Sequence, residues 1–284
     1  MRVRLLALCA VAMLSCSSPP DAGKLSCNAV EGVEPVLTAP GIFIGDMHGT
    51  QESPAFLRDL SCHVMKAGKP LVIAMEYDAA DQAVLDAFLQ SPDEEQASRL
   101  LTSTVHWTRN MDGRASPAMR DALLAIRRYA RAGGKVRLLA YDLKPSPGKE
   151  RDTASAEYIS GERARDRSNA YWIVFGGNVH ARKIKGLPME GFENLEPLGY
   201  QIRNWNLIHL NAKSRGGSGW GCVGTDFQKN CSIMQLGPSC TTDCPAHPVI
   251  RLMRSGPDDA YDGYYDVGKL TASPPLHLES DKPQ

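Results

Sequence analysis

The sequence predicts an α/β fold: a mostly parallel β-sheet with helices on both faces. Short apolar runs alternate along the chain with longer segments whose apolar residues recur at helical spacing, which is the pattern of strand–helix–strand units. Polar residues follow each apolar run at once, as expected for buried parallel strands that end at a solvent-facing edge. The 284 residues are 43% hydrophobic and 23% charged, a globular composition that excludes disorder and coiled coil.

Four apolar runs are predicted to be buried strands, because they are short and rich in Val, Ile and Leu. They are residues 41–45, 70–75, 136–141 and 171–175. Three later segments also have strand character and are expected to extend the same sheet; they are residues 200–203, 205–210 and 249–253.

The first long helix is predicted to begin at Ser53-Pro54 and to end at Gly68, since Pro is favoured in the first helical turn and Gly after the last. Its apolar residues share one face at helical spacing: Phe56, Leu57, Leu60 and Val64. Further helices are expected at 79–90, 93–103 and 116–132, and a helix of mixed charge flanked by loops is expected within 144–169.

The first 15 residues are predicted to be a signal peptide. Arg2 and Arg4 precede an apolar run at 5–14 that is too short to span a bilayer. The run leads into Cys16 in a pattern that resembles the lipobox of bacterial lipoproteins, in which this Cys carries the lipid; simple cleavage without lipidation is the alternative. We therefore expect an exported protein, anchored in the outer membrane and facing the periplasm, with residues 16–30 as a flexible tether.

Export makes disulfides the expected state of the cysteines, because an even number remains after processing and the compartment is oxidising. The six are Cys27, Cys62, Cys222, Cys231, Cys240 and Cys244. The economical pairing joins Cys27 to Cys62 and places two bridges in a Gly- and Ser-rich insertion at 215–248. A zinc site that uses Cys240, Cys244 and His247 is the alternative.

Charge and missing motifs exclude several classes of partner. The chain has 32 basic and 32 acidic side chains, and loss of the signal peptide removes two arginines, so the sequence lacks the excess of positive charge that binds nucleic acid. Without a GxGxxG or Walker A motif, a nucleotide cofactor is not expected. Without a GxSxG motif or an unpaired Cys, a covalent acyl-enzyme is disfavoured. We expect one domain over 31–272 and a loose tail over 273–284.

Polar side chains directly follow four of the predicted strands. Asp46 and His48 follow the first strand, Glu76 the second, Asp142 the third and His180 the fourth. In such sheets, ligands bind beyond the carboxyl ends of the parallel strands. Two histidines and three carboxylates are therefore predicted to form one functional site.

Imidazoles beside carboxylates support hydrolysis by two routes. A carboxylate can hold a histidine in the tautomer that acts as a general base towards water. Alternatively, His48, Glu76 and His180 can ligate a divalent metal that lowers the pKa of bound water. Arg58 and Arg182, which lie near the two histidines in sequence, are candidates for binding substrate.

The segment GIFIGDMHGTQESPAFL, the acidic Glu76 and the later GGNVHARK resemble the superfamily that groups erythromycin esterase-like enzymes, ChaN-type haem-binding lipoproteins and Tiki/TraB proteins. The resemblance implies that His48 is the esterase base or a metal ligand, Glu76 the acid of the second strand and His180 the distal histidine. Glu52 falls where the motif often has a further glutamate, and Asp46 replaces a glutamate of the esterases.

The resemblance covers about residues 36–210 and implies different functions in different branches. Esterase-like members are hydrolases and Tiki-like members resemble metal-dependent proteases, so we expect first an envelope-anchored hydrolase of a small-molecule or peptide substrate, with Tyr77 beside the substrate. ChaN-like members bind haem non-covalently and are linked to iron uptake, which makes Tyr77, Met47 or Tyr141 the axial ligand. A non-catalytic envelope protein that binds a partner through 215–248 is the third alternative.

Overall fold

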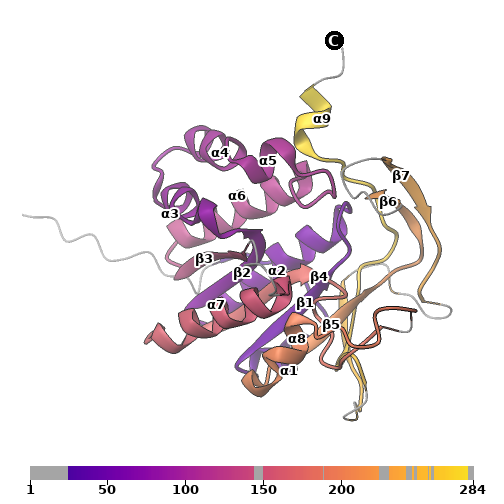
Figure 1. Cartoon of the computed structure of the whole chain (residues 1–284). Helices are drawn as coiled ribbons and strands as arrows, with labels where there is room; N and C mark the ends of the chain where they lie inside the picture. The colour runs from indigo at the N-terminus through magenta and orange to yellow at the C-terminus, as the bar shows by residue number, and fades with distance from the viewer. Residues whose placement is uncertain are drawn as a thin grey trace, which may run out of the picture.

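The computed structural model describes residues 25–143, 150–187, 189–223, 230–240, 245, 248–254, 256 and 259–280. Its main element is a seven-stranded sheet of order β3-β2-β4-β1-β5-β9-β8, in which only the β8–β9 pair is antiparallel (Figure 1). The strands are β1 (Gly41–Asp46), β2 (Leu71–Asp78), β3 (Val136–Asp142), β4 (Tyr171–Gly177), β5 (Ile208–Lys213), β8 (Val249–Leu252) and β9 (Gly263–Asp266). The mostly parallel sheet of the sequence prediction is confirmed.

Helices cover both faces of the sheet, because alternate residues of each buried strand point to opposite sides. On one face, Ile42 and Ile44 of β1 pack in the same cluster as Phe56 of α2. On the other face, Phe43 packs in a cluster with Ile159 of α7. The helices are α1 (Val33–Leu37), α2 (Glu52–Lys66), α3 (Gln82–Gln90), α4 (Glu94–Thr102), α5 (Val105–Arg109), α6 (Pro117–Arg131), α7 (Arg151–Arg165), α8 (Leu198–Gln201) and α9 (Leu276–Ser280), with 3-10 turns η2 (Ala79–Asp81) and η3 (Arg203–Trp205).

Capping residues in the sequence mark where two of the helices begin. Ser116 caps α6 by accepting a hydrogen bond from the Met119 N–H, and Pro117 occupies the first turn. Asp93 caps α4 in the same way through the N–H of Gln96. These helices end within a residue or two of the predicted bounds.

Two expectations about the C-terminal half are wrong. Residues 200–203, predicted to be a strand, belong to α8 and η3, and β5 begins only at Ile208. A short apolar run has no length or period that separates a strand from a helical turn. Strand β9 was not predicted, because its four residues GYYD carry no apolar alternation.

The order of the strands does not follow the chain. Strand β4 lies between β1 and β2 and pairs with both, so that Gly45 faces Gly176, and Met75 faces Phe175. The carboxyl ends of β3, β2, β4 and β1 are therefore neighbours along one edge, which brings the predicted polar residues together.

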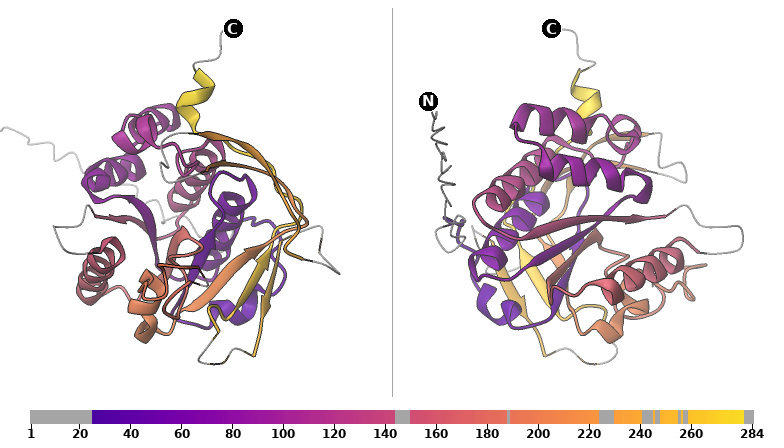
Figure 2. Two further views of the ribbon diagram at one scale, coloured as in Figure 1. Left: turned by 45° about the vertical axis from the view of Figure 1, so that its right-hand side comes forward. Right: turned by 90° about the vertical axis from the view of Figure 1, so that its left-hand side faces the viewer.

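The C-terminal insertion forms a separate antiparallel hairpin, β6 (Gly217–Cys222) and β7 (Cys231–Leu236), along one side of the main sheet (Figure 2). Disulfides join Cys222 to Cys231 across the hairpin and Cys27 to Cys62 at the start of the domain. Cys240 is also disulfide-bonded. Cys16, Cys244 and His247 lie outside the described residues, as do the signal peptide and the first part of the tether.

Both ends of the described chain pack against the domain. Leu25 and Val30, in the segment expected to be a tether, are buried in the core. Ser273 is buried where a loose tail was expected, and the N–H of Leu276 donates to the carbonyl of Ala115. Within the described ranges, no helix is both long enough and apolar enough to cross a membrane.

Candidate active site

The first part of the site is an aspartate–histidine pair at the end of β1. Asp46 is the last residue of the strand and is buried, and its Oδ2 lies 2.6 Å from Nδ1 of His48. The turn that follows reverses at Gly49, whose φ of 71° favours glycine. The carboxylate therefore holds the imidazole with Nε2 directed away from it.

Glu76, at the end of β2, lies at the centre of the site. The register of β2 against β3 shifts between Met75 and Asp78, an irregularity of the kind that redirects side chains next to functional sites. Oε2 of Glu76 accepts the N–H of Gly177 at 2.9 Å. Oε1 accepts from Arg114 at 2.9 Å and from Arg151 at 2.7 Å. This buried carboxylate is thus paired with two guanidinium groups.

A second aspartate–histidine pair lies on the other side of Glu76. Nδ1 of His180, in the turn after β4, is 2.7 Å from Oδ1 of Asp152 in the first turn of α7. Oδ2 of Asp152 also accepts the N–H of Leu198 at 3.0 Å, which fixes the carboxylate. Arg151 lies 3.4 Å from Nε2 of His180, so the guanidinium and the imidazole share one edge of the site.

The two imidazoles face a shared space over Gly177. Nε2 of His48 is 3.6 Å from Oε2 of Glu76, and Nε2 of His180 is 3.7 Å from Oε1. A Cβ atom added to Gly177 would lie 3.2 Å from Nε2 of His48 and 3.3 Å from Cδ2 of His180. Both imidazoles retain about a quarter of their side-chain exposure, 24% and 25%. Glycine at this position therefore keeps open the space into which both rings project.

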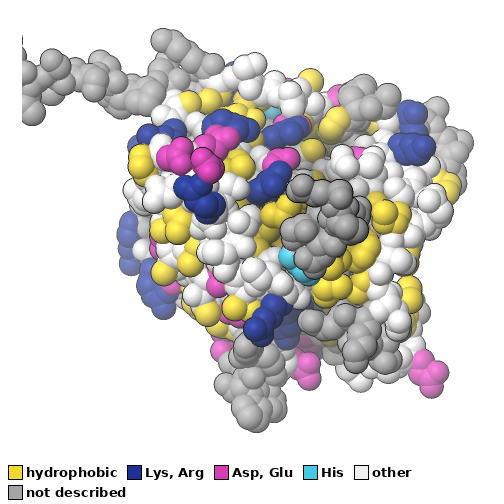
Figure 3. Space-filling model, turned by 90° about the horizontal axis from the view of Figure 1, so that it is seen from above, with side chains coloured by type: hydrophobic (Ala, Val, Ile, Leu, Met, Phe, Trp, Pro, Cys, Tyr) yellow, Lys and Arg dark blue, Asp and Glu magenta, His cyan; other side chains and the backbone are white. Residues whose placement is uncertain are grey.

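A pocket of about 580 Å³ adjoins the second pair. Arg151 and His180 line it on one side, and Phe192 and Leu195 supply apolar surface on the other. A view of the molecule from above shows a histidine side chain at the surface among hydrophobic and basic side chains (Figure 3). The pocket therefore opens onto the second aspartate–histidine pair.

Burial and charge set the pKa values of the three central groups. Burial by itself would raise the pKa of Glu76, but Arg114 and the neighbouring imidazoles hold it well below its usual range. Burial would lower the pKa of His48, yet Asp46 and Glu76 outweigh burial and raise it. For His180, Glu76 and Asp152 do the same. Glu76 is therefore ionised, and both histidines are stronger bases than usual.

The structure brings some of the predicted residues to this site and not others. Asp142 reaches it through Arg151, whose Nε donates to Oδ1 at 2.7 Å. Tyr77 lies beneath it, buried, with its hydroxyl 3.4 Å from the carbonyl of Arg114. Three residues have partners elsewhere: Glu52 accepts the N–H of Thr271, Arg58 pairs with Asp59, and Arg182 contacts Tyr261.

Four residues of the site were not singled out from the sequence: Asp112, Arg114, Arg151 and Asp152. None follows an apolar run, so each looks like an ordinary loop or helix-end charge. Only the fold shows that they share a buried carboxylate or imidazole as partner.

The site suits proton transfer better than metal binding. Among the described residues, no group of three or more His, Cys, Asp or Glu side chains could hold a metal ion. The set predicted for a metal, His48, Glu76 and His180, does lie together, but Oε1 of Glu76 already accepts from Arg114 and Arg151. Two guanidinium groups on the central carboxylate would oppose a divalent cation.

The predicted haem ligands do not fit an axial site either. Tyr77 and Tyr141 are each only 3% exposed, and both direct their hydroxyls at backbone carbonyls. Burial raises the pKa of both phenols, which disfavours a tyrosinate ligand. Met47 packs against the core. A haem on this chain would therefore need a different ligand.

Two of the solved structures similar to this chain, an erythromycin esterase and a succinoglycan biosynthesis protein, share its fold. An erythromycin esterase, the EreC mutant in its open conformation, has a TM-score of 0.59 and 11% identity, covering 84% of this chain and 93% of its own. A succinoglycan biosynthesis protein has a TM-score of 0.55 and 9% identity, covering 87% and 93%. The haem-binding ChaN of Campylobacter jejuni has a TM-score of 0.38 and 13% identity, covering 72% and 91%.

No family model and no curated protein matches the sequence. At such low identity the structural likeness shows a common fold. The neighbours do include an erythromycin esterase, one of the proteins that the resemblance of the sequence named. The chain therefore has the α/β fold that an erythromycin esterase also uses, built around two aspartate–histidine pairs and one buried glutamate.

Proposed function

We propose that the protein is a hydrolase of carboxylic esters or amides. One observation carries the proposal: the Nε2 atoms of His48 and His180 lie 3.6 and 3.7 Å from the same Glu76 carboxylate, while a second carboxylate holds Nδ1 of each ring. This is the arrangement of a general base oriented by an acidic partner. Paired histidines allow one imidazole to take a proton while the other gives one.

In the proposed reaction, Nε2 of His48 removes a proton from water as the water oxygen bonds to the substrate carbonyl carbon. The resulting imidazolium is stabilised by Asp46, at 2.6 Å, and by Glu76. When the tetrahedral intermediate collapses, the carbon–oxygen or carbon–nitrogen bond breaks, and His180 in its protonated form donates a proton to the leaving group. The products are a carboxylic acid and an alcohol or amine. His48 then returns its proton, through water, to His180.

Positive charge for the developing oxyanion comes from Arg151. Its side chain is 36% exposed and lines the pocket, whereas that of Arg114 is 15% exposed and points at Glu76. A cation in a partly dry site stabilises negative charge that develops in the transition state. The apolar surface of Phe192 and Leu195 on the far wall suits an apolar portion of the substrate.

The test replaces each imidazole and measures turnover of a panel of aryl esters and anilides by the purified protein. His48→Ala and His180→Ala are each expected to lower kcat on the order of 10²- to 10⁴-fold, the usual contribution of a positioned acid or base. His63→Ala is the matched control, since its ring lies 2.8 Å from the carbonyl of Asn28, away from the site. Full activity in both site variants would disprove the assignment.

The haem and metal alternatives are separated on the same preparation. Addition of haemin at micromolar concentration is expected to give no saturable Soret shift. Elemental analysis of protein purified without chelator is expected to show no stoichiometric transition metal. The haem-binding alternative would be favoured by two results together. The protein would bind one equivalent of haem, equally well in the His48→Ala variant, and it would hydrolyse none of the esters or anilides.

We also infer that the protein works in the bacterial envelope as a lipoprotein. The apolar N-terminal run and Cys16 support this, together with disulfides such as Cys27–Cys62, which form in oxidising compartments. Cells that express the chain are expected to incorporate labelled palmitate into it and to place it in the membrane fraction. Loss of both signals in Cys16→Ala, with the label retained in Ser17→Ala, would locate the lipid.

A further inference from the structure

We propose that the disulfide-linked hairpin β6–β7 is a positioning element of the active site. It holds the arginine loop, residues 110–114, so that Arg114 reaches Glu76. The inference rests on the hydrolase proposed above, and it gives the C-terminal insertion a role inside the enzyme.

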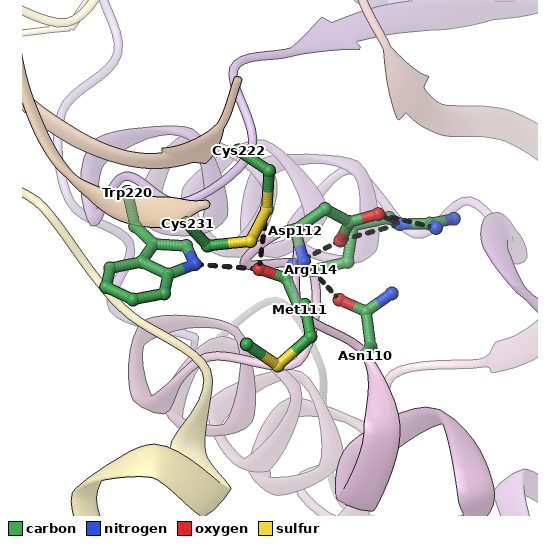
Figure 4. The surroundings of a disulfide bond; sticks show 7 residues. All are labelled: Asn110, Met111, Asp112, Arg114, Trp220, Cys222 and Cys231. Atoms are coloured by element: carbon green, nitrogen blue, oxygen red, sulfur yellow. Dashed lines mark hydrogen bonds and ion pairs between the residues drawn. A yellow bond between two sulfur atoms is a disulfide. The ribbon is translucent and has the colours of Figure 1, made fainter. Parts of the chain in front are cut away.

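Two groups of the hairpin contact the arginine loop at the backbone carbonyl of Met111. Nε1 of Trp220 donates to the carbonyl of Met111 at 2.7 Å, and Sγ of Cys222 lies 3.4 Å from the same oxygen (Figure 4). Trp220 and the disulfide lie on one side of Met111, and Asp112 and Arg114 on the other. Two features of the hairpin therefore converge on one atom of the loop.

Inside the loop, a series of short contacts leads from that carbonyl to the active site. Oδ1 of Asn110 accepts the N–H of Asp112, and Oδ1 of Asp112 accepts the N–H of Arg114, each at 3.1 Å. The Asp112 carboxylate also pairs with the Arg114 guanidinium at 2.7 Å. Arg114 then donates to Oε1 of Glu76 at 2.9 Å and to the Glu76 carbonyl at 3.0 Å. A shift at Met111 would thus move the guanidinium.

Backbone packing connects the hairpin to the histidine turn as well. The N–H of Trp220 donates to the carbonyl of Gly49 at 2.9 Å. A Cβ at Gly49 would lie 2.1 Å from the carbonyl oxygen of Trp220, and one at Gly113 would lie 2.4 Å from Cα of Gly49. Only glycine allows the three segments to approach so closely. The turn after His48, the arginine loop and β6 are therefore packed backbone against backbone.

The disulfide matters because it links the two strands of the hairpin at its outer end. Among the described residues, β6 and β7 form a two-stranded sheet of their own, and an isolated two-stranded hairpin is marginally stable in water. The start of β6 is held by Leu270, whose carbonyl accepts the N–H of Ser218. The far end, where Cys222 faces Cys231, carries the contact with Met111. Reduction is expected to release this end without disturbing the seven-stranded sheet.

Withdrawal of Arg114 has a predictable electrostatic effect. Arg114 lowers the pKa of Glu76, so its removal raises that pKa, and loss of positive charge beside the imidazoles raises their pKa values too. The acidic limb of the kcat profile should therefore move to higher pH.

The experiment compares Trp220→Phe, which removes the indole N–H donor and keeps an aromatic ring, and the double variant Cys222→Ser/Cys231→Ser with the wild type. We expect kcat to fall about fivefold to tenfold, the size of one lost hydrogen bond, with the acidic limb displaced to higher pH. The matched control is Cys27→Ser/Cys62→Ser, which removes a disulfide in the core and should lower Tm without moving the profile. In an Arg114→Ala background, Trp220→Phe should have no further effect on kcat.

A second readout does not depend on turnover. The His48 and His180 imidazole resonances, assigned through the alanine variants, are titrated by NMR in the wild type and in Trp220→Phe, and higher titration midpoints are expected in the variant. If the midpoints move but the wild type hydrolyses no ester or amide, the positioning inference stands and the proposed function fails. Two results would contradict the positioning role of the hairpin. The first is turnover by the wild type with no change in the pH profile or in the histidine midpoints of Trp220→Phe. The second is additive effects of Trp220→Phe and Arg114→Ala on kcat.

Discussion

The two aspartate–histidine pairs of the site are alike in geometry and different in origin. Asp46 and His48 are two residues apart in the turn after one strand, and their contact is 2.6 Å. Asp152 and His180 are 28 residues apart, on a helix and a strand end, and their contact is 2.7 Å. The first pair is packed against the hairpin, while the second opens to the pocket and to Arg151. The two pairs contain the same groups in different surroundings, which fits the different roles proposed for His48 as base and His180 as acid.

The largest expected effect comes from the residue that both pairs share. Glu76→Gln removes the charge that stabilises both imidazolium ions and leaves Arg114 and Arg151 without a central anionic partner. We expect kcat/KM to fall on the order of 10³-fold and the free energy of unfolding to fall by about 3 kcal/mol, as for a broken buried ion pair. Steady-state kinetics and urea unfolding measure the two quantities. Glu52→Gln, at the N-terminus of α2, should change neither by much.

The space between the pairs is tested next by Gly177→Ala. The added methyl group would lie 3.2 Å from His48 and 3.3 Å from His180, inside the space where the substrate carbonyl must sit. We expect about a 100-fold loss of kcat/KM with little change in Tm, since misplacement of about 1 Å in a site has that order of effect. Gly237→Ala is the control, because nothing lies within 4 Å of a Cβ at that position. Equal activity of the two variants would place the reaction elsewhere.

Replacing the aspartate of one pair at a time shows which histidine is the base and which is the acid. Asp46→Asn and Asp152→Asn each remove the charge that raises the pKa of the adjacent histidine, while burial continues to lower it. The pKa of that histidine should therefore fall. If His48 is the base, Asp46→Asn moves the acidic limb of kcat/KM to lower pH, and Asp152→Asn moves the basic limb to lower pH. We expect rate losses of about 10- to 100-fold in each variant. The opposite assignment of limbs would exchange the roles of His48 and His180.

The smallest effect concerns the unmodified protein. Both histidine pKa values are raised, so the acidic limb of its pH–rate profile should lie above pH 6.5. The same shift favours the folded state most below pH 6.5, and that stabilisation is lost as pH rises through the native pKa. A profile of kcat/KM between pH 5 and 9 checks the first statement. A limb below pH 6.5 would mean that neither raised imidazole is the base.

Much of the fold could be predicted from the sequence, because its signals are local. The strands β1 to β4 are short apolar runs, and α4 and α6 begin at the capping residues Asp93 and Ser116. The β5–β9 half was harder, since α8 and β9 are each four residues long. Periodicity cannot identify so short an element.

The residues of the candidate site also differ in whether their positions could be predicted from nearby sequence. Asp46, His48, Glu76 and His180 could be found because each follows a buried strand, and parallel strands end at a common edge. Arg114, Arg151 and Asp152 could not, since they reach Glu76 and His180 from a loop and a helix that follow no such rule. Arg58 was a sequence neighbour of the motif, yet its helix directs it to Asp59.

The sequence by itself determined the α/β class, the strand-end histidines and acids, and an even set of cysteines suited to disulfides, because these depend on local spacing and residue type. Tertiary structure alone decided the insertion of β4 between β1 and β2, the second aspartate–histidine pair and the contact of Trp220 with Met111 across 109 residues. Those features depend on which distant surfaces bury one another. Burial also makes the charges interact strongly enough to shift the pKa values on which the proposed chemistry depends.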